Sequence, residues 1–128
     1  MVADVLVIDD EPAILDVVRA CLGDEGYRVA VAPTLAAGLE RLARDRFALI
    51  LADGFCYQPD PWDGLDRIRA AAPATPIVIC SAHRRDLFDG WAGHGFAGLL
   101  PKPFDLDDLL AHVRAHFGPP CCAPPVDR

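Results

Sequence analysis

The chain has 128 residues, of which 52% are hydrophobic and 24% charged, and this composition and length are typical of one globular domain. No apolar stretch approaches the roughly 20 residues that cross a bilayer, so a membrane-spanning protein is not expected. Nineteen acidic residues against twelve basic ones give a formal net charge of -7. That sign is wrong for a surface that tracks phosphates, so direct nucleic-acid binding is not expected either.

The first residues of the chain and its cysteines indicate the cellular compartment of the protein. Residues 2–8 have a strand pattern in place of the basic and apolar regions of a signal peptide. The five cysteines show no spacing that suits a zinc site or a disulfide framework, and Cys21 and Cys80 fall within apolar periodic segments. We therefore expect a cytoplasmic protein with reduced thiols.

The first half of the chain alternates apolar strands with helical patterns. Residues 5–8 predict a strand, and Pro12 suits the first turn of the helix that follows. A second strand is expected at 27–32, and Thr34 can cap a second helix. Residues 47–52 are apolar throughout, as expected of a strand that is buried on both faces.

The second half repeats the alternation after a loop at 54–64. A helix is expected from Leu65 onward, and Asp105 can cap the last helix. Val17 in the first helix and Leu106 in the last belong to apolar stripes and are expected to be buried. The remaining expected elements are strands at 77–80 and 96–100 and helices at 84–92 and 106–117.

Five such strand and helix units predict an α/β fold with one doubly wound, five-stranded parallel sheet and helices on both faces. The expected strand order is the flavodoxin-like 2-1-3-4-5. We expect residues 1–118 to form the domain. Residues 119–128 contain four prolines and predict a disordered tail or linker.

Charged residues follow three of the predicted strands. Asp9 and Asp10 follow the first strand, Asp53 ends the third, and Lys102, the only lysine of the chain, follows the fifth. In the expected order these strand ends meet at one edge of the sheet, where open α/β sheets bind ligands. Crowded carboxylates favour a hard divalent cation with oxygen ligands, and we expect Mg²⁺ (or Mn²⁺). For a single acid, however, stabilisation of a helix N-terminus is an alternative role.

Four motifs in order give the chain a resemblance to the receiver domain of two-component response regulators, across residues 3–117. They are the acidic pair after the first strand, Asp53 after the third, Ser81-Ala82 after the fourth, and Lys102-Pro103-Phe104 after the fifth. The resemblance implies a signalling phosphoacceptor that catalyses at most its own phosphorylation and dephosphorylation. Asp53 would accept a phosphoryl group from a phosphohistidine on a sensor histidine kinase or phosphotransfer protein.

The resemblance also implies roles for the neighbouring groups. Asp9, Asp10, Asp53 and the backbone carbonyl of Phe55 would hold the metal ion, with Asp9 acting partly through water. Lys102 and the Ser81 hydroxyl would bind the phosphoryl oxygens. These roles agree with the needs of phosphoryl transfer, which depends mainly on position and on charge neutralisation.

The chain departs from the family pattern at three places. Leu99 stands three residues before Lys102, where receivers usually carry Tyr or Phe. The loop after Asp53 is longer than usual and contains aromatic residues, among them Phe55 and Trp62, which would either contact a partner or fold against the domain. His83 lies two residues past Ser81, and we hypothesise that His83 and Phe55 tune the lifetime of the acyl phosphate.

Two other functions compete with the phosphoacceptor. One is a receiver-like interaction module that binds its partner without phosphorylation, which Leu99 favours. The other is a small phosphohydrolase with an aspartate nucleophile, but the alternate acidic residues and the substrate-enclosing cap expected of that class are missing from the sequence. The partners expected for the leading interpretation are a kinase or phosphotransfer protein and a downstream protein target or output domain.

Overall fold

The computed structural model describes residues 4–53, 61–81, 90, 92–93, 95–101 and 105–117. In these ranges strands and helices alternate along the first half of the chain. In order, the elements are β1 (Val5–Ile8), α1 (Pro12–Asp24), β2 (Val29–Ala32), α2 (Leu35–Arg44), β3 (Leu49–Asp53), α3 (Pro61–Ala71), β4 (Ile77–Ser81), β5 (Gly98–Pro101) and α4 (Leu106–Phe117).

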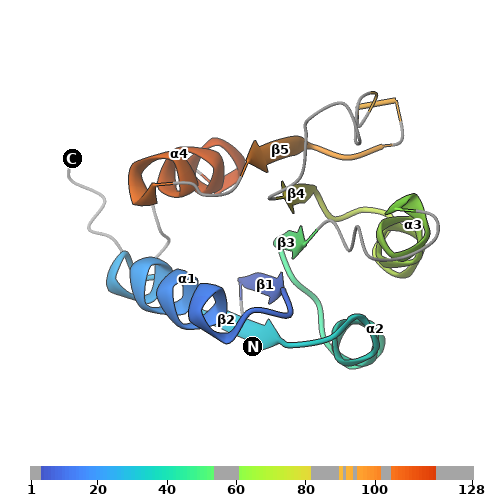
Figure 1. Ribbon diagram of the computed structural model, residues 1–128, viewed down its shortest axis with the longest axis horizontal. Coiled ribbons are helices and arrows are strands. Elements are labelled where there is room, and N and C mark those ends of the chain that lie inside the picture. Colours follow the sequence, from blue (N-terminus) through green and yellow to red (C-terminus); the bar gives the residue numbers. More distant parts are fainter. Residues whose placement is uncertain are drawn as a thin grey trace.

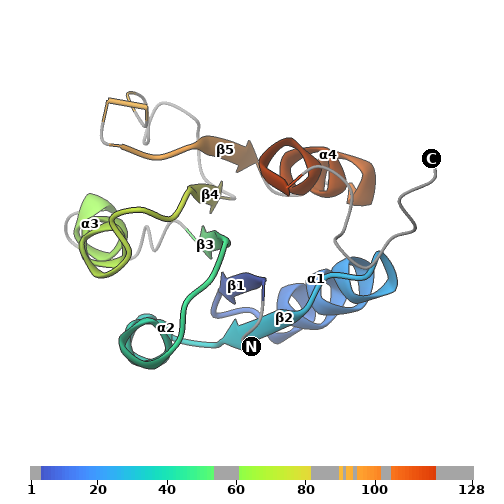
Figure 2. The same ribbon diagram turned by 180° about the vertical axis from the view of Figure 1, so that it is seen from behind.

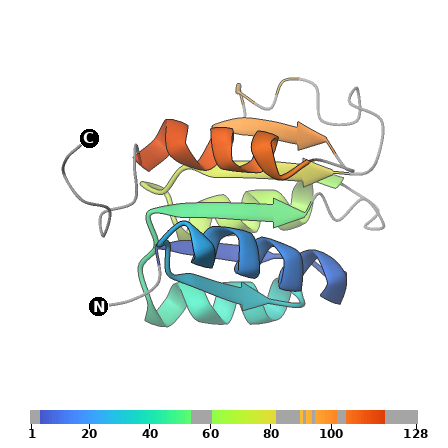
Figure 3. The same cartoon turned by 90° about the vertical axis from the view of Figure 1, so that its left-hand side faces the viewer.

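Within the described residues, five parallel strands form one sheet in the order β2-β1-β3-β4-β5. Helices α1 and α4 cover one face of the sheet, and α2 and α3 cover the other (Figure 1; Figure 2 shows the same arrangement from behind). Seen from the side, α1 and α4 run antiparallel to the strands that they cover (Figure 3). The predicted fold class and strand order are confirmed.

The core consists of one apolar layer on each face of the sheet. Successive residues of β1 divide between them, because side chains alternate along a strand: Val5 and Val7 pack under α1 and α4, whereas Leu6 and Ile8 pack under α2 and α3. Both faces of β1 and β3 are therefore buried, which explains their uninterrupted apolar sequences.

Polar side chains start two of the helices as predicted. The Thr34 hydroxyl accepts a hydrogen bond from the Ala37 amide (3.0 Å), and the Asp105 carboxylate accepts one from the Asp108 amide (2.8 Å). Pro12 occupies the first turn of α1. Gly26, with a φ of 95°, lets the chain turn from α1 toward β2.

The predicted start of the third helix was wrong. Helix α3 begins at Pro61 and not at Leu65, since proline is well suited to a first turn even where the apolar pattern has not yet begun. Trp62 consequently belongs to the helix. Its ring packs against the core and lies 5.5 Å from the Phe96 ring between centroids, so this aromatic folds against the domain.

Other differences are smaller. Val17 (47% exposed) and Leu106 (45% exposed) were expected to be buried, but the sheet lies under other positions of their helices. The helix expected at 84–92 falls largely outside the described residues, yet Gly90, with a φ of 83°, and Ala92 are turn residues, so a helix does not extend to 92. Strand ends differ from the predictions by a residue or two.

Gly38 lets α2 approach β1 closely. A Cβ atom at Gly38 would lie 2.5 Å from Cδ1 of Ile8, a core side chain that is fully buried. Among the helices of the described segments, none is long and apolar enough to cross a membrane.

We expect Gly38→Ala to lower the free energy of unfolding by about 1–3 kcal/mol, because the added methyl overpacks the contact with Ile8. The measurement is urea denaturation followed by circular dichroism. Gly23→Ala is the matched control: a Cβ there meets nothing within 4 Å, so stability should stay the same or rise by up to about 1 kcal/mol. Ile8→Val removes the Cδ1 methyl. If Gly38→Ala lowers the free energy of unfolding by the same amount in the Ile8→Val variant as in the unmodified protein, the explanation is contradicted.

Candidate functional site

The register of the sheet brings the predicted site residues to one edge. Ile8 of β1 pairs with Ala52 of β3, so Asp9 and Asp53, the next residue on each strand, lie side by side. On the other side of β3, Asp53 pairs with Cys80, which places Ser81 one residue further along β4. Three chain segments that are distant in sequence therefore end at the same level.

Three carboxylates converge at this edge. One oxygen from each of Asp9, Asp10 and Asp53 lies within 4.8 Å of the others. Their surroundings differ: Asp9 is 2% exposed, Asp53 is half-buried and Asp10 is exposed. The prediction that these three side chains lie together is thus matched by the geometry, and the cluster extends from the protein interior to solvent.

Backbone groups hold Asp9 in place. Its Oδ1 accepts a hydrogen bond from the Glu11 amide (2.9 Å), and its own amide donates to the carbonyl of Ala32 (3.1 Å), which continues the pairing between β1 and β2. Helix α1 starts directly afterward at Pro12, and its positive N-terminal end favours negative charge nearby. Asp9 therefore both stabilises the N-terminal end of α1 and belongs to the cluster of three carboxylates.

The electrostatics of the cluster call for a cation. Two carboxylates at about 5 Å repel each other by about 1 kcal/mol in a water-like medium and by about 3 kcal/mol at the effective dielectric constant of a protein surface. Oxygen ligands of this kind, with one face open to solvent, suit Mg²⁺, which takes few protein ligands and keeps several waters. The site thus has the donor set for a hard divalent cation.

Ser81 is at the same edge and is 4% exposed, which is unusual for a serine at the end of a strand. Ser81 also pairs in the sheet with Pro101, the last residue of β5. Lys102 follows Pro101 in the sequence but lies outside the described residues, as do Phe55 and His83. The roles predicted for these three residues therefore remain predictions.

Sequence reasoning overlooked the Glu11 amide, which orients Asp9. Nearly every residue type has a backbone amide, so the sequence does not indicate which amide binds Asp9. The only available signal was Pro12, which fixes where the helix starts. The two described cysteines, Cys21 and Cys80, form no disulfide in the described part of the chain, and Cys80 is the sheet partner of Asp53. Burial, together with the nearby carboxylates of Glu25 and Asp24, raises the pKa of the Cys21 thiol, so it is a poor nucleophile at neutral pH.

Comparison with known proteins identifies the family. The model of the response regulator receiver domain family matches residues 5–114. The transcriptional regulatory protein DltR of Streptococcus agalactiae (serotype III, strain NEM316) is 33% identical over 111 residues, covering 85% of this chain and 49% of that protein. The response regulator MprA of Mycobacterium leprae (strain TN) is 33% identical over 113 residues, covering 87% of this chain and 49% of that protein.

A solved structure agrees with these matches. The chemotaxis protein CheY4 of Vibrio cholerae superposes with a TM-score of 0.77 at 26% identity, covering 91% of this chain and 99% of that one. The chain belongs to the response regulator receiver domain family of two-component signalling. It spans about half the length of the curated relatives that it matches.

We expect Mg²⁺ to raise the melting temperature of this domain, because a ligand that binds only the folded state at 100 times its dissociation constant adds about 2.7 kcal/mol of stability. Asp10→Asn should weaken this effect, since it removes one ligand oxygen, and should raise the melting temperature without metal, since it also removes a repelling charge. Differential scanning fluorimetry with and without EDTA measures both.

Asp16→Asn is the control for this experiment, because Asp16 is an exposed acid of α1 that does not belong to the cluster. It should leave the Mg²⁺ response as in the unmodified protein. An equal loss of the response in the two variants would mean that Mg²⁺ acts through general surface charge.

Proposed function

We propose that this domain accepts a phosphoryl group on Asp53 from a phosphohistidine of a sensor histidine kinase or phosphotransfer protein, and that phosphorylation changes its affinity for a partner. The observation that carries the proposal is the convergence of three carboxylates at the carboxyl edge of the sheet in a chain of the receiver family. The reaction would require Mg²⁺ (or Mn²⁺). On this proposal the domain is no enzyme for a separate substrate.

Asp53 is the nucleophile in this proposal. One of its carboxylate oxygens forms a bond to phosphorus as the bond between phosphorus and the histidine nitrogen breaks, and the histidine leaves as neutral imidazole after taking up a proton. Half-burial suits this role, because the carboxylate is reachable by a partner yet shielded from full hydration. Asp9, held by the Glu11 amide, stays in position throughout.

The other residues of the site would neutralise and orient the transferred group. A bound Mg²⁺, held by the carboxylates of Asp9, Asp10 and Asp53 and by the Phe55 carbonyl, would offset the charge that develops on the phosphoryl oxygens. The Lys102 ammonium would pair first with Asp53 and then with the phosphoryl oxygens. The buried Ser81 hydroxyl would donate a hydrogen bond to one of them.

Leu99 supports a second candidate function, the interaction module that binds its partner without phosphorylation. Its side chain is half-buried and packs against the core layer under α2 and α3. An aliphatic side chain there offers no ring whose rotation could report the state of Asp53, as the aromatic residue usual at this position would.

The proposal extends to the organisation of the complete protein. Residues 1–118 would be the receiver and 119–128 a proline-rich tail or linker, in the cytoplasm. The negative charge argues against nucleic-acid binding only for these 128 residues. A relative such as DltR is a transcriptional regulatory protein, so the expectation of no nucleic-acid partner finds no support for a longer protein.

Acetyl phosphate with Mg²⁺ should add one phosphoryl group to the unmodified chain and none to Asp53→Asn, as read by intact-mass spectrometry. Asp53→Asn keeps the size of the side chain but removes the anionic nucleophile. The control Asp16→Asn should be phosphorylated normally. Phosphorylation of Asp53→Asn would overturn the assignment, whereas stable phosphorylation with unchanged partner binding would favour the interaction module.

His83→Ala and Phe55→Ala should each change the rate of dephosphorylation without abolishing phosphorylation, if these side chains govern how water reaches the acyl phosphate. The measurement is the decay of the phosphorylated mass after acetyl phosphate has been removed. Thr34→Ala, which affects only a helix cap, is the comparison for nonspecific loss of stability. The hypothesis fails if either substitution leaves the decay rate unchanged.

A further inference from the structure

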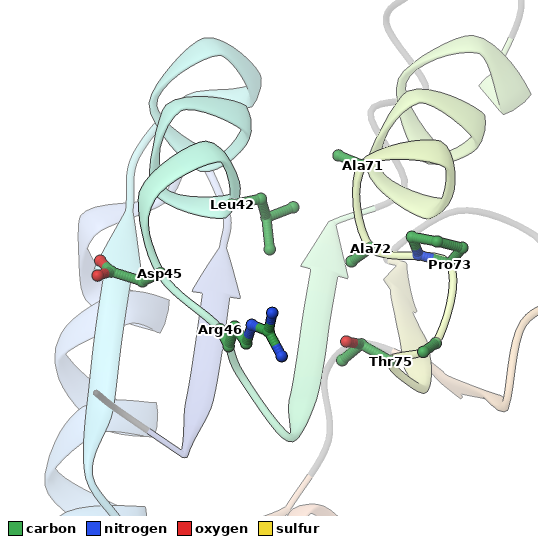
Figure 4. A pocket seen from close by; sticks show the side chains of 8 residues that line it. Leu42, Asp45, Arg46, Ala71, Ala72, Pro73 and Thr75 are labelled. Carbon is green, nitrogen blue, oxygen red and sulfur yellow. The ribbon is translucent and has the colours of Figure 1, made fainter. Parts of the chain in front are cut away.

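A crevice of about 330 Å³ opens at the edge of the sheet opposite the acidic cluster. It lies between the ends of α2 and α3 and the turn that leads into β4 (Figure 4). Its walls are mixed: apolar side chains, among them Leu42, Ala71 and Pro73, alternate with polar groups. A space of this size is at the lower end of the range for small-molecule sites.

One cation faces this space. The Arg46 guanidinium extends into the gap between α2 and the start of β4 (Figure 4), and among the described residues it makes no hydrogen bond or ion pair. The adjacent Asp45 does not neutralise it. The Asp45 carboxylate points away from Arg46 and lies 3.6 Å from Nε of Arg41.

The remaining polar side chain of the wall is already engaged. The Thr75 hydroxyl donates a hydrogen bond to the carbonyl of Phe47 (3.3 Å), so it does not compete with Arg46 as a donor to a ligand. An arginine fork beside the apolar side chains of Leu42, Ala71 and Pro73 matches a planar carboxylate that carries an apolar group. The crevice therefore has the features of a site for an amphipathic anion.

The helix ends limit the charge of that anion. Both α2 and α3 end beside the crevice, at Arg44 and Ala71, and the C-terminal end of a helix carries a partial negative charge. Two such ends and the carboxylate of Asp45 would repel a doubly charged phosphate, but they would attract an N–H group. The favoured ligand has one carboxylate, a nearby nitrogen donor and a short apolar side chain.

We propose that this crevice binds an apolar amino acid through its free α-carboxylate, with Arg46 as the anion-binding residue. The amino acid would be either free in solution or the carboxyl-terminal residue of a peptide. This site is separate from the acidic cluster and does not depend on phosphorylation, so the two proposals fail independently.

The first test uses three matched probes with the full ¹⁵N-labelled chain. N-acetyl-leucine and leucine carry the carboxylate, and N-acetyl-leucinamide lacks it. Amide chemical shifts of Ala71, Ala72 and Thr75 should saturate with a carboxylate probe at a dissociation constant on the order of 1 mM. The amide should bind about tenfold more weakly or worse, since it loses the charge-assisted hydrogen bonds.

The source of the carboxylate follows from the same titrations. Tighter binding of N-acetyl-leucine would identify the end of a peptide, and tighter binding of leucine would identify the free amino acid, whose ammonium group can approach the two helix ends. No saturable shift with either carboxylate, or equal binding of the amide, overturns the proposal.

Substitutions in and beside the crevice then test which residues bind the probe. Arg46→Gln should weaken binding about tenfold or more, whereas Arg44→Gln should leave it unchanged, because Arg44 is exposed and does not line the crevice. Ala71→Leu fills the space without altering charge and should abolish binding; Ala71 is exposed, so the fold should tolerate the change. Circular dichroism checks that each variant is folded. Equal weakening by Arg44→Gln and Arg46→Gln would mean general attraction to the arginines and would overturn the proposal.

Discussion

Repulsion among Asp9, Asp10 and Asp53 is the constraint on which the functional edge of this domain depends. The three carboxylates meet because the parallel register of β1 and β3 ends both strands at one level, and that register is in turn set by strands whose two faces are both buried. The packed sheet therefore fixes the backbone positions beside Asp9 and Asp53. The repulsion therefore favours a bound cation, which the proposed role of Asp53 would require.

The polarity of the βα units explains why the two edges of the molecule have different chemistry. At the carboxyl edge, the positive N-terminal end of α1 and the Glu11 amide lie beside the acidic cluster. At the opposite edge, α2 and α3 present their negative ends beside the crevice and Arg46. On the two proposals, the same dipoles would favour phosphoryl chemistry at one edge and restrict the other to a singly charged anion.

Two residues that depart from the family pattern, Trp62 and Leu99, concern how phosphorylation of Asp53 would change the rest of the domain. Trp62 is half-buried, because its ring packs against Phe96 and the core. Leu99 packs into the same core layer. Under the proposed function, position 99 contributes no rotating aromatic ring to the response to phosphorylation, so its own contribution would be a shift of packed elements.

The sequence by itself determined the fold class, the strand order and the grouping of Asp9, Asp10 and Asp53, because buried parallel strands leave a continuous apolar pattern and their ends must meet at one edge. Only the tertiary structure decided where α3 begins, that Val17 and Leu106 are exposed, how closely Gly38 approaches Ile8, and that the Glu11 amide holds Asp9. The crevice at Arg46 was equally invisible. Such features depend on the distance and orientation between elements far apart in the chain, which local periodicity does not encode.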